Sequence, residues 1–179
     1  MGFDGASLKV LVIEHNQHFR QLIRTVLSTL GVGQVEEVND GTQALSRLRR
    51  FAADVVIADW KMEPMDGILF THSLRRRADS PNPFLPIIMV AGSAEAAMMA
   101  EARDAGVDEF LIKPFSARNL IGRITSVIVT PRDFVSCETY VGPDRRRRLL
   151  PFVGAERRRC PATVVSPQGR MRTAGGGLR

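Results

Sequence analysis

The chain has 179 residues, 44% of them hydrophobic, and a formal net charge of +6, which suits one domain of ordinary size with an appendage. No run of about eighteen apolar residues occurs, so we expect no membrane-spanning helix, and residues 1–7 lack the charged and apolar regions of a signal peptide. The two cysteines, Cys137 and Cys160, match no zinc-ligand or multi-disulfide spacing, so we expect reduced thiols in a cytoplasmic protein.

Positive charge is concentrated in the last quarter of the chain. Residues 1–130 hold 14 Lys and Arg against 15 Asp and Glu, whereas residues 131–179 hold 11 Arg against 4 acidic residues. Such asymmetry is typical of a tail that meets an anionic partner.

Five short runs rich in Val and Ile recur through the first 130 residues. They cover residues 8–13, 35–38, 55–58, 87–90 and 107–112. Because the runs at 55–58 and 87–90 are apolar at every position, they favour strands covered on both faces, as in a parallel sheet. Stretches with helical spacing follow them, and Gly31 and Gly106 stand where the first and fourth helices should end. The alternation predicts a five-stranded, parallel, doubly wound α/β sheet of the flavodoxin-like class.

The alternating pattern stops after Thr130. Five prolines interrupt any helix in the remaining segment, and residues 170–179, with three consecutive glycines, are predicted to be disordered. We therefore divide the chain into a domain over residues 1–130 and an arginine-rich, ligand-binding tail over residues 131–179. Because this tail has no core of its own, we expect it to be largely disordered without ligand and to gain order only from a ligand or from docking.

Reactive groups in such sheets gather beyond the carboxyl ends of the strands. The residues at these places are Glu14, His15, Asp59, Ala91, Gly92, Ser93 and Lys113. Segment 54–67 around Asp59 and segment 110–115 around Lys113 resemble the phosphorylation segment and the closing strand of response-regulator receiver domains of the CheY-like type. The resemblance extends over about residues 8–129, with the motifs in the right order and at the right spacing.

That resemblance implies a role for each of these side chains. Asp59 would be the phosphoacceptor, a carboxylate that acts as nucleophile on a phosphoryl group. Lys113 would be the fixed cation that stabilises the phosphoryl oxygens, and Phe110 would be the aromatic switch residue before it. Glu14 and the residue at position 15 would hold Mg²⁺ together with Asp59.

Two positions depart from the pattern of the family. His15 stands where the family has a second carboxylate, and imidazole is a poor ligand for Mg²⁺. Ala91 stands where the family has a hydroxyl group, which Ser93 would supply only after a shift of the strand end. Two interpretations stay open: a regularly phosphorylated receiver, and a receiver that seldom carries a phosphoryl group and serves as a docking module.

The tail contains one pattern twice, at an offset of twelve residues. In each copy an aromatic residue, Val, Gly, a small residue or Pro, and an acidic residue precede at least three arginines. The first copy supplies Tyr140, Gly142, Pro143, Asp144, Arg145, Arg146, Arg147 and Arg148, and the second supplies Phe152, Glu156, Arg157, Arg158 and Arg159. A segment that acts by charge alone has no need to keep these residue types in register. We interpret the duplication as recognition of a ligand with two like halves.

Each residue type in the pattern suits a guanine nucleotide. Arginine pairs in two-pronged fashion with phosphate or with the O6 and N7 atoms of guanine, and it stacks on bases. A carboxylate accepts from guanine N1–H and the 2-amino group, and aromatic rings add stacking faces. Cyclic di-GMP has two such bases and two phosphates, and we predict it as the ligand.

A receiver followed by such a tail resembles the Cle proteins, CheY-like effectors that append an arginine-rich, cyclic di-GMP-binding segment. That resemblance implies ligand-dependent docking at the flagellar motor switch, control of motility and surface attachment, and recruitment of a cytoplasmic protein to the flagellated pole. Asp144 and the arginines after it would form the main ligand-binding block, and Glu156 and the arginines after it the supporting one. The chain would be a non-enzymatic signalling adaptor with no catalytic residue and no membrane insertion.

Other functions are compatible with the same residues. The main alternative is a response regulator that a histidine kinase drives through phosphorylation of Asp59, with a basic tail that binds nucleic acid. An anionic-membrane tether would need an apolar face beside the charge, which a proline-broken segment lacks. A further alternative is a receiver that acts as a dimerisation or scaffold unit, with a tail that binds nothing.

Overall fold

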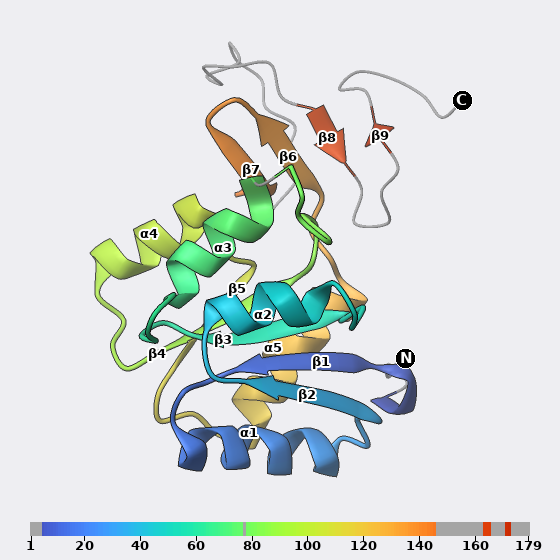
Figure 1. The fold of residues 1–179 in the computed structure, drawn as a ribbon, viewed down its shortest axis with the longest axis vertical. Helices are drawn as coiled ribbons and strands as arrows, with labels where there is room; N and C mark the ends of the chain where they lie inside the picture. The colour runs from blue at the N-terminus through green and yellow to red at the C-terminus, as the bar shows by residue number, and fades with distance from the viewer. Residues whose placement is uncertain (1–4, 77, 146–162, 166–170, 173–179) are drawn as a thin grey trace.

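The computed structural model describes residues 5–76, 78–145, 163–165 and 171–172 of the chain (Figure 1). Its main body is a sheet with helices on both faces. The strands of this sheet are β1 (Lys9–Ile13), β2 (Gln34–Val38), β3 (Val55–Asp59), β4 (Ile87–Ala91) and β5 (Glu109–Ile112). All neighbouring strands are parallel, in the order β2-β1-β3-β4-β5. The predicted doubly wound α/β fold is confirmed.

Five helices alternate with these strands. They are α1 (Gln17–Thr29), α2 (Gly41–Leu48), α3 (Gly67–Arg76), α4 (Ala96–Ala105) and α5 (Ala117–Val129), and a short 3-10 turn, η1 (Gly5–Ser7), precedes β1. Helices α1 and α5 cover one face of the sheet, and α2, α3 and α4 cover the other. None of the described helices is long and apolar enough to cross a membrane.

An apolar core on each face of the sheet holds the layers together. Strands β3 and β4 are buried along their whole length, as their continuous apolar runs predict. Phe70 and Leu74 of α3 pack into one core, and Leu27 of α1 and Ile124 of α5 pack into the other; all four side chains are fully buried. These cores fix the strand ends in space and so fix the residues that follow them.

The two glycines predicted at helix ends both have left-handed backbone conformations. Gly31 follows α1 with φ 70°, and Gly106 caps α4 with φ 100°, a region that favours glycine. Next to Gly106, the Val107 N–H donates to the Ala102 carbonyl. This bond closes the helix, so β5 begins at Glu109 and not at residue 107 as predicted.

Residues 131–145 form structure that the sequence does not predict. Strands β6 (Phe134–Cys137) and β7 (Tyr140–Pro143) make an antiparallel hairpin beside α3 and α4 (Figure 1). Strand β8 (Thr163–Val165) pairs with β6 and β9 (Met171–Arg172) pairs with β8, which gives the order β7-β6-β8-β9. Residues 131–145 belong to the segment that we expected to gain order only from a ligand or from docking, and their hairpin docks on α3 and α4.

The hairpin docks through Phe134, whose ring is 2% exposed. This ring meets Phe84 edge to face with 5.5 Å between centroids, and the guanidinium of Arg75 lies 4.9 Å from its centroid. An aromatic ring attracts a cation over its face, the more so away from water. Phe134 thus covers a charged side chain of α3 from the tail side.

Arg75 is fully buried, and its guanidinium is surrounded by acceptors. It donates to the carbonyls of Pro83 at 2.7 Å and Leu85 at 2.8 Å, twice to the Gly106 carbonyl at 3.0 and 3.1 Å, and to the Asp108 carboxylate at 3.1 Å. Burial lowers the pKa of Arg75 and raises the pKa of Asp108. A buried charge is tolerated only when it is paired and hydrogen-bonded in this way.

Two glycines let the hairpin approach the end of α4 closely. A Cβ atom on Gly142 would lie 2.8 Å from the Gly106 Cα atom, and a Cβ atom on Gly106 would lie 2.7 Å from the Val141 carbonyl oxygen. Real Cβ contacts are not this short. The strand β7 and the α4–β5 turn therefore require glycine on both sides of their contact.

We predict that Phe134→Ala lowers the free energy of unfolding by about 3 kcal/mol or more, since a buried Phe→Ala change leaves a cavity and uncovers Arg75. Urea unfolding followed by the fluorescence of Trp60, the one tryptophan of the chain, measures this. Leu69→Ala, at a side chain that is 51% exposed, is the control and should change the midpoint little. An unchanged midpoint for Phe134→Ala would show that the hairpin does not stabilise the domain.

Candidate functional site

The carboxyl ends of β1, β3 and β5 bring three charged side chains together. Glu14 follows β1, Asp59 ends β3 and Lys113 follows β5. The Lys113 ammonium lies 2.6 Å from Glu14 Oε2 and 2.8 Å from Asp59 Oδ1. Both carboxylates are buried, at 1% and 5% exposure. The structure thus assembles the predicted phosphoacceptor, its acidic neighbour and the predicted cation in one place.

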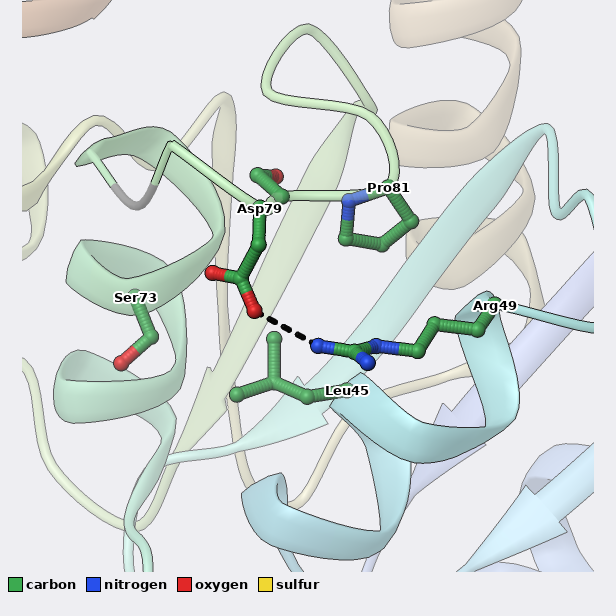
Figure 2. Close-up of a pocket in the computed structure, with 6 residues that line it drawn as sticks. Leu45, Arg49, Ser73, Asp79 and Pro81 are labelled. Carbon is green, nitrogen blue, oxygen red and sulfur yellow. Dashed lines mark hydrogen bonds and ion pairs between the residues drawn. The ribbon is translucent and has the colours of Figure 1, made fainter.

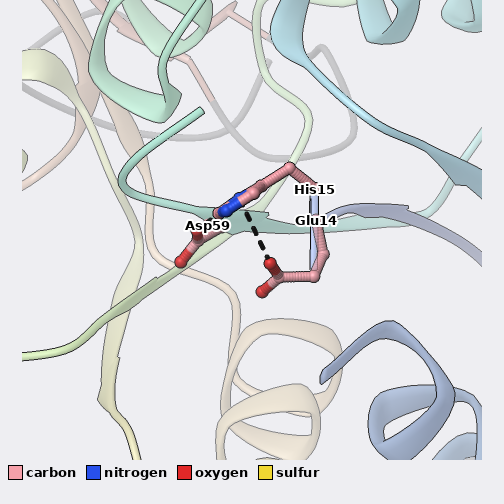
Figure 3. Close-up of side chains that lie close together, drawn as sticks. All are labelled: Glu14, His15 and Asp59. Carbon is pink, nitrogen blue, oxygen red and sulfur yellow. Dashed lines mark ion pairs between the residues drawn. The ribbon is translucent and has the colours of Figure 1, made fainter. Parts of the chain in front are cut away.

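His15 lies over the other side of the two carboxylates (Figure 3). Its Nδ1 atom is 3.5 Å from Glu14 Oε1 and 3.4 Å from Asp59 Oδ2, while its side chain is 56% exposed. Asp59 therefore has Lys113 at one carboxylate oxygen and an imidazole at the other. When protonated, His15 would supply a second positive charge at the mouth of the site.

Glu14, His15 and Asp59 are the residues that could hold a metal here, since their ligand atoms all lie within 4.8 Å of one another. The donor set consists of two carboxylates and one imidazole. Mg²⁺ prefers oxygen ligands in octahedral geometry, whereas imidazole suits Zn²⁺, Cu²⁺ or Ni²⁺. These residues do not fit Mg²⁺ well.

The other predicted site positions offer no hydroxyl group directed at Asp59. Ala91 ends β4, and the Ser93 hydroxyl donates to Met98 Sδ at 3.3 Å. Phe110, at the predicted switch position, is partly buried against the core and meets Trp60 edge to face at 6.2 Å. Ser93 therefore does not replace the missing hydroxyl in this arrangement.

Two residues of the site escaped the sequence analysis. The Lys113 ammonium lies 4.3 Å from the centroid of the Phe19 ring, a cation–π contact. The Asn16 N–H donates to Glu14 Oε1 at 2.9 Å, and the Asn16 side chain caps α1. Asn16 carries the sequence signal of an N-cap, but Phe19 carries none, because its contact depends on where the distant Lys113 side chain reaches in the folded chain.

At the start of the arginine run, the guanidinium of Arg145 stacks on the ring of Tyr140. The Arg145 guanidinium lies 4.3 Å from the Tyr140 ring centroid and 3.0 Å from the carboxylate of Asp104 on α4. Burial raises the pKa of Tyr140, against the opposing effect of Arg145, so its hydroxyl stays protonated at neutral pH and donates to the Pro143 carbonyl at 2.7 Å. The first arginine of the run is thus held at the surface of the domain.

The remaining predicted ligand-binding residues fall into two groups. Gly142 and Pro143 are buried in the hairpin, where Gly142 has a packing role, and Asp144 donates its N–H to the Asp133 carbonyl at 2.7 Å. Their ligand-binding role stays a prediction. Outside the described residues lie Arg146, Arg147, Arg148, Phe152, Glu156, Arg157, Arg158 and Arg159.

We predict that His15→Asp raises the affinity for Mg²⁺ about tenfold or more, because it supplies the all-oxygen ligand set that this ion prefers. Titration with Mg²⁺, followed by the fluorescence of Trp60 next to Asp59, measures the change. His18→Asp, at an exposed position of α1, adds the same charge outside the site and should leave the affinity as in the wild type. Equal Mg²⁺ affinity for His15→Asp and the wild type would contradict the assignment of His15 as the obstacle.

Comparisons with known proteins agree with this geometry. Residues 10–125 match the family model of the response regulator receiver domain. The chain is 31% identical over 121 residues to the chemotaxis protein CheY-3 of Vibrio cholerae, covering 68% of this chain and 92% of that protein. It is 33% identical over 120 residues to the chemotaxis protein CheY of Pseudomonas aeruginosa, covering 67% and 95%.

Solved structures show the same likeness. The crystal structure of Vibrio cholerae CheY4 superposes with a TM-score of 0.63 at 29% identity, covering 68% of this chain and 98% of that one. The shared part ends before the hairpin, since the family match stops at residue 125. With the buried Glu14, Asp59 and Lys113 at the strand ends, the family match identifies the chain as a member of the response regulator receiver family.

Proposed function

We propose that this protein is a non-enzymatic signalling adaptor that binds cyclic di-GMP through its arginine-rich tail and docks on a protein partner to control motility and surface attachment. The observation that carries the proposal is the position of Arg145. The repeated acid-and-arginine pattern starts on a hairpin that is packed on the receiver, so its first arginine, Arg145, lies against the receiver at Asp104.

The receiver's own site supports a docking role more than phosphorylation-driven signalling. His15 lies at Asp59 Oδ2, where the family has a second carboxylate, and Ala91 offers no hydroxyl. The relatives named above are chemotaxis proteins, which favours a partner at the flagellar motor switch. We place the protein in the cytoplasm, with recruitment to the flagellated pole when the ligand is bound.

The docked hairpin provides a route from ligand to receiver. Arg145 contacts Asp104 on α4, and Arg76 of α3 donates to the Thr139 carbonyl in the turn between β6 and β7. A ligand that competes with Asp104 for Arg145 interacts differently with the two arrangements of this arginine, paired with Asp104 or released from it. Such a difference is the condition for a population shift. The ion pair is exposed and therefore contributes only about 0–1 kcal/mol, so a dianionic ligand can displace it.

We predict that cyclic di-GMP binds the full chain more tightly than GMP or cyclic di-AMP, and that Arg145→Ala with Arg146→Ala weakens this binding by about tenfold or more. Each lost charged hydrogen bond costs about 1.5–3 kcal/mol, which is the physical reason for the size of the effect. Isothermal titration calorimetry measures both quantities. Arg50→Ala with Arg118→Ala, two exposed arginines of the receiver, is the charge-matched control. Equal affinity for all three nucleotides would reject guanine recognition.

The second candidate is a phosphorylated response regulator whose tail contacts nucleic acid, and the contact between Lys113 and Asp59 favours it. It requires acetyl-phosphate labelling that Asp59→Ala abolishes, and duplex binding that falls steeply with salt. We expect weak labelling of the wild type, measured with radiolabelled acetyl phosphate, because His15 and Ala91 replace groups that the chemistry uses. Strong labelling together with salt-sensitive duplex binding would favour this candidate over the adaptor.

A further inference from the structure

A hollow between α2 and the loop after α3 is too small for an organic ligand (Figure 2). Its volume is about 20 Å³, and the ion pair of Arg49 with Asp79, 2.6 Å between Nη2 and Oδ2, crosses it. A space of this size holds about one water molecule. The charged side chains at the strand ends need no such cavity, because a metal ion occupies only the space between its ligand atoms.

Glu14 and Asp59 stand side by side because their strands pair in register. Ile13 of β1 lies opposite Ala58 of β3, and Glu14 and Asp59 are the residues that follow these two in the sequence. Both carboxylates are buried. Lys113 pairs with one oxygen of each carboxylate, so the second oxygen of each faces a different partner.

That partner is the ring of His15 (Figure 3). Its Nδ1 atom lies 3.5 Å from Glu14 Oε1 and 3.4 Å from Asp59 Oδ2. These distances are too long for strong hydrogen bonds, whose N···O length is about 2.7–3.2 Å. Two carboxylate oxygens and one imidazole nitrogen therefore surround one space without direct bonding contact.

The spacing of these three atoms is that of a tetrahedral zinc site. Zn–O and Zn–N bonds of about 2.0–2.2 Å place neighbouring ligand atoms of a tetrahedron about 3.3–3.6 Å apart. The octahedral geometry of Mg²⁺, with bonds of about 2.0–2.1 Å, places them only about 2.8–3.0 Å apart. The distances of 3.4 and 3.5 Å from the His15 nitrogen to the two oxygens agree with the tetrahedron and exceed the octahedral spacing.

The chemistry of the ligand atoms favours the same ion. Zn²⁺ binds imidazole nitrogen and carboxylate oxygen, and three protein ligands leave its fourth position to water. Cu²⁺ and Ni²⁺ prefer square-planar or tetragonal arrangements, which three atoms at tetrahedral spacing do not provide. The His15 side chain is 56% exposed, so an ion can enter from solvent and water can reach the fourth position.

Neighbouring groups hold the two carboxylates in place and leave room for an ion. The Lys113 ammonium contacts Glu14 Oε2 and Asp59 Oδ1, which are the oxygens turned away from His15. The Asn16 N–H donates to Glu14 Oε1 at 2.9 Å, and a carboxylate oxygen has two lone pairs, so the second remains for a metal. Outer partners of this kind orient metal ligands. Two ionised carboxylates beside one lysine also leave a net negative charge, which favours a cation.

We propose that Glu14, His15 and Asp59 form a zinc site, in which Glu14 Oε1, Asp59 Oδ2 and the imidazole of His15 bind Zn²⁺ and a water molecule takes the fourth position. The site replaces the Mg²⁺ site that the receiver family implies. Through the ion, the segment after β1 is joined to the end of β3. The receiver thus has a ligand of its own, and this inference does not depend on cyclic di-GMP binding by the tail.

Titration of the full chain with Zn²⁺ tests the site, by calorimetry on protein without a histidine tag. We expect His15→Ala to weaken Zn²⁺ binding about tenfold or more, because even the outer partner of a metal ligand contributes about 10–100-fold to affinity. His15 is exposed, so its replacement should leave the fold intact. His18→Ala, at an exposed histidine of α1 that is not part of the three-residue group, is the matched control and should bind Zn²⁺ as the wild type does.

The visible spectrum of bound Co²⁺ tests the geometry. Co²⁺ adopts the tetrahedral coordination of zinc sites and then absorbs visible light far more strongly than octahedral, hydrated Co²⁺. We expect the wild type and His18→Ala to show the strong tetrahedral spectrum, and Zn²⁺ to remove it by displacing Co²⁺. His15→Ala should show only the weak octahedral spectrum.

Each outcome decides for or against the zinc site. Equal Zn²⁺ affinity in the wild type and His15→Ala would reject it and place any bound zinc elsewhere in the chain. A wild type that binds no Zn²⁺ would show that His15 serves only as an ion-pair partner of the two carboxylates. Loss of binding in His15→Ala but not in His18→Ala, with the tetrahedral Co²⁺ spectrum, supports the site.

Discussion

The buried guanidinium of Arg75 is the contact on which the arrangement of receiver and tail depends. It collects the carbonyls of Pro83, Leu85 and Gly106 and the carboxylate of Asp108, and Phe134 covers it from the tail. Removing such a charge from water costs several kcal/mol unless hydrogen bonds replace the hydration shell. The hairpin completes that replacement, so residues 134–143 behave as part of the receiver and not as a loose appendage.

Because the hairpin is fixed, the origin of the arginine run is fixed as well. Arg145 leaves the hairpin between Tyr140 and Asp104, and Arg132 donates to the carbonyl of Asp144 just before it. Helix α4, the α4–β5 turn and the end of α5 therefore all border the place where the tail begins. A ligand bound there would touch elements of the receiver as well as the tail, which gives one structural basis for coupling the two.

The receiver could be predicted from sequence because its signals are local. Continuous Val and Ile runs predict its buried strands, and strand ends place Glu14, Asp59 and Lys113 at one edge of the sheet. The hairpin could not be predicted, because its stability comes from a distant partner. Arg75 lies in a row of three arginines that resembles a solvated surface, and nothing near Phe134 in the sequence indicates that its ring covers this side chain.

We infer that the receiver senses ligand binding by the tail through the docked hairpin. Hydrogen–deuterium exchange of the full chain, with and without cyclic di-GMP, tests it most directly. We expect slower exchange with ligand in the amides of β6, β7 and the C-terminal turn of α4, while α1 on the opposite face of the sheet stays unchanged. Protection confined to residues after Arg145, or equal protection by cyclic di-AMP, would show that the hairpin does not transmit ligand binding to the receiver.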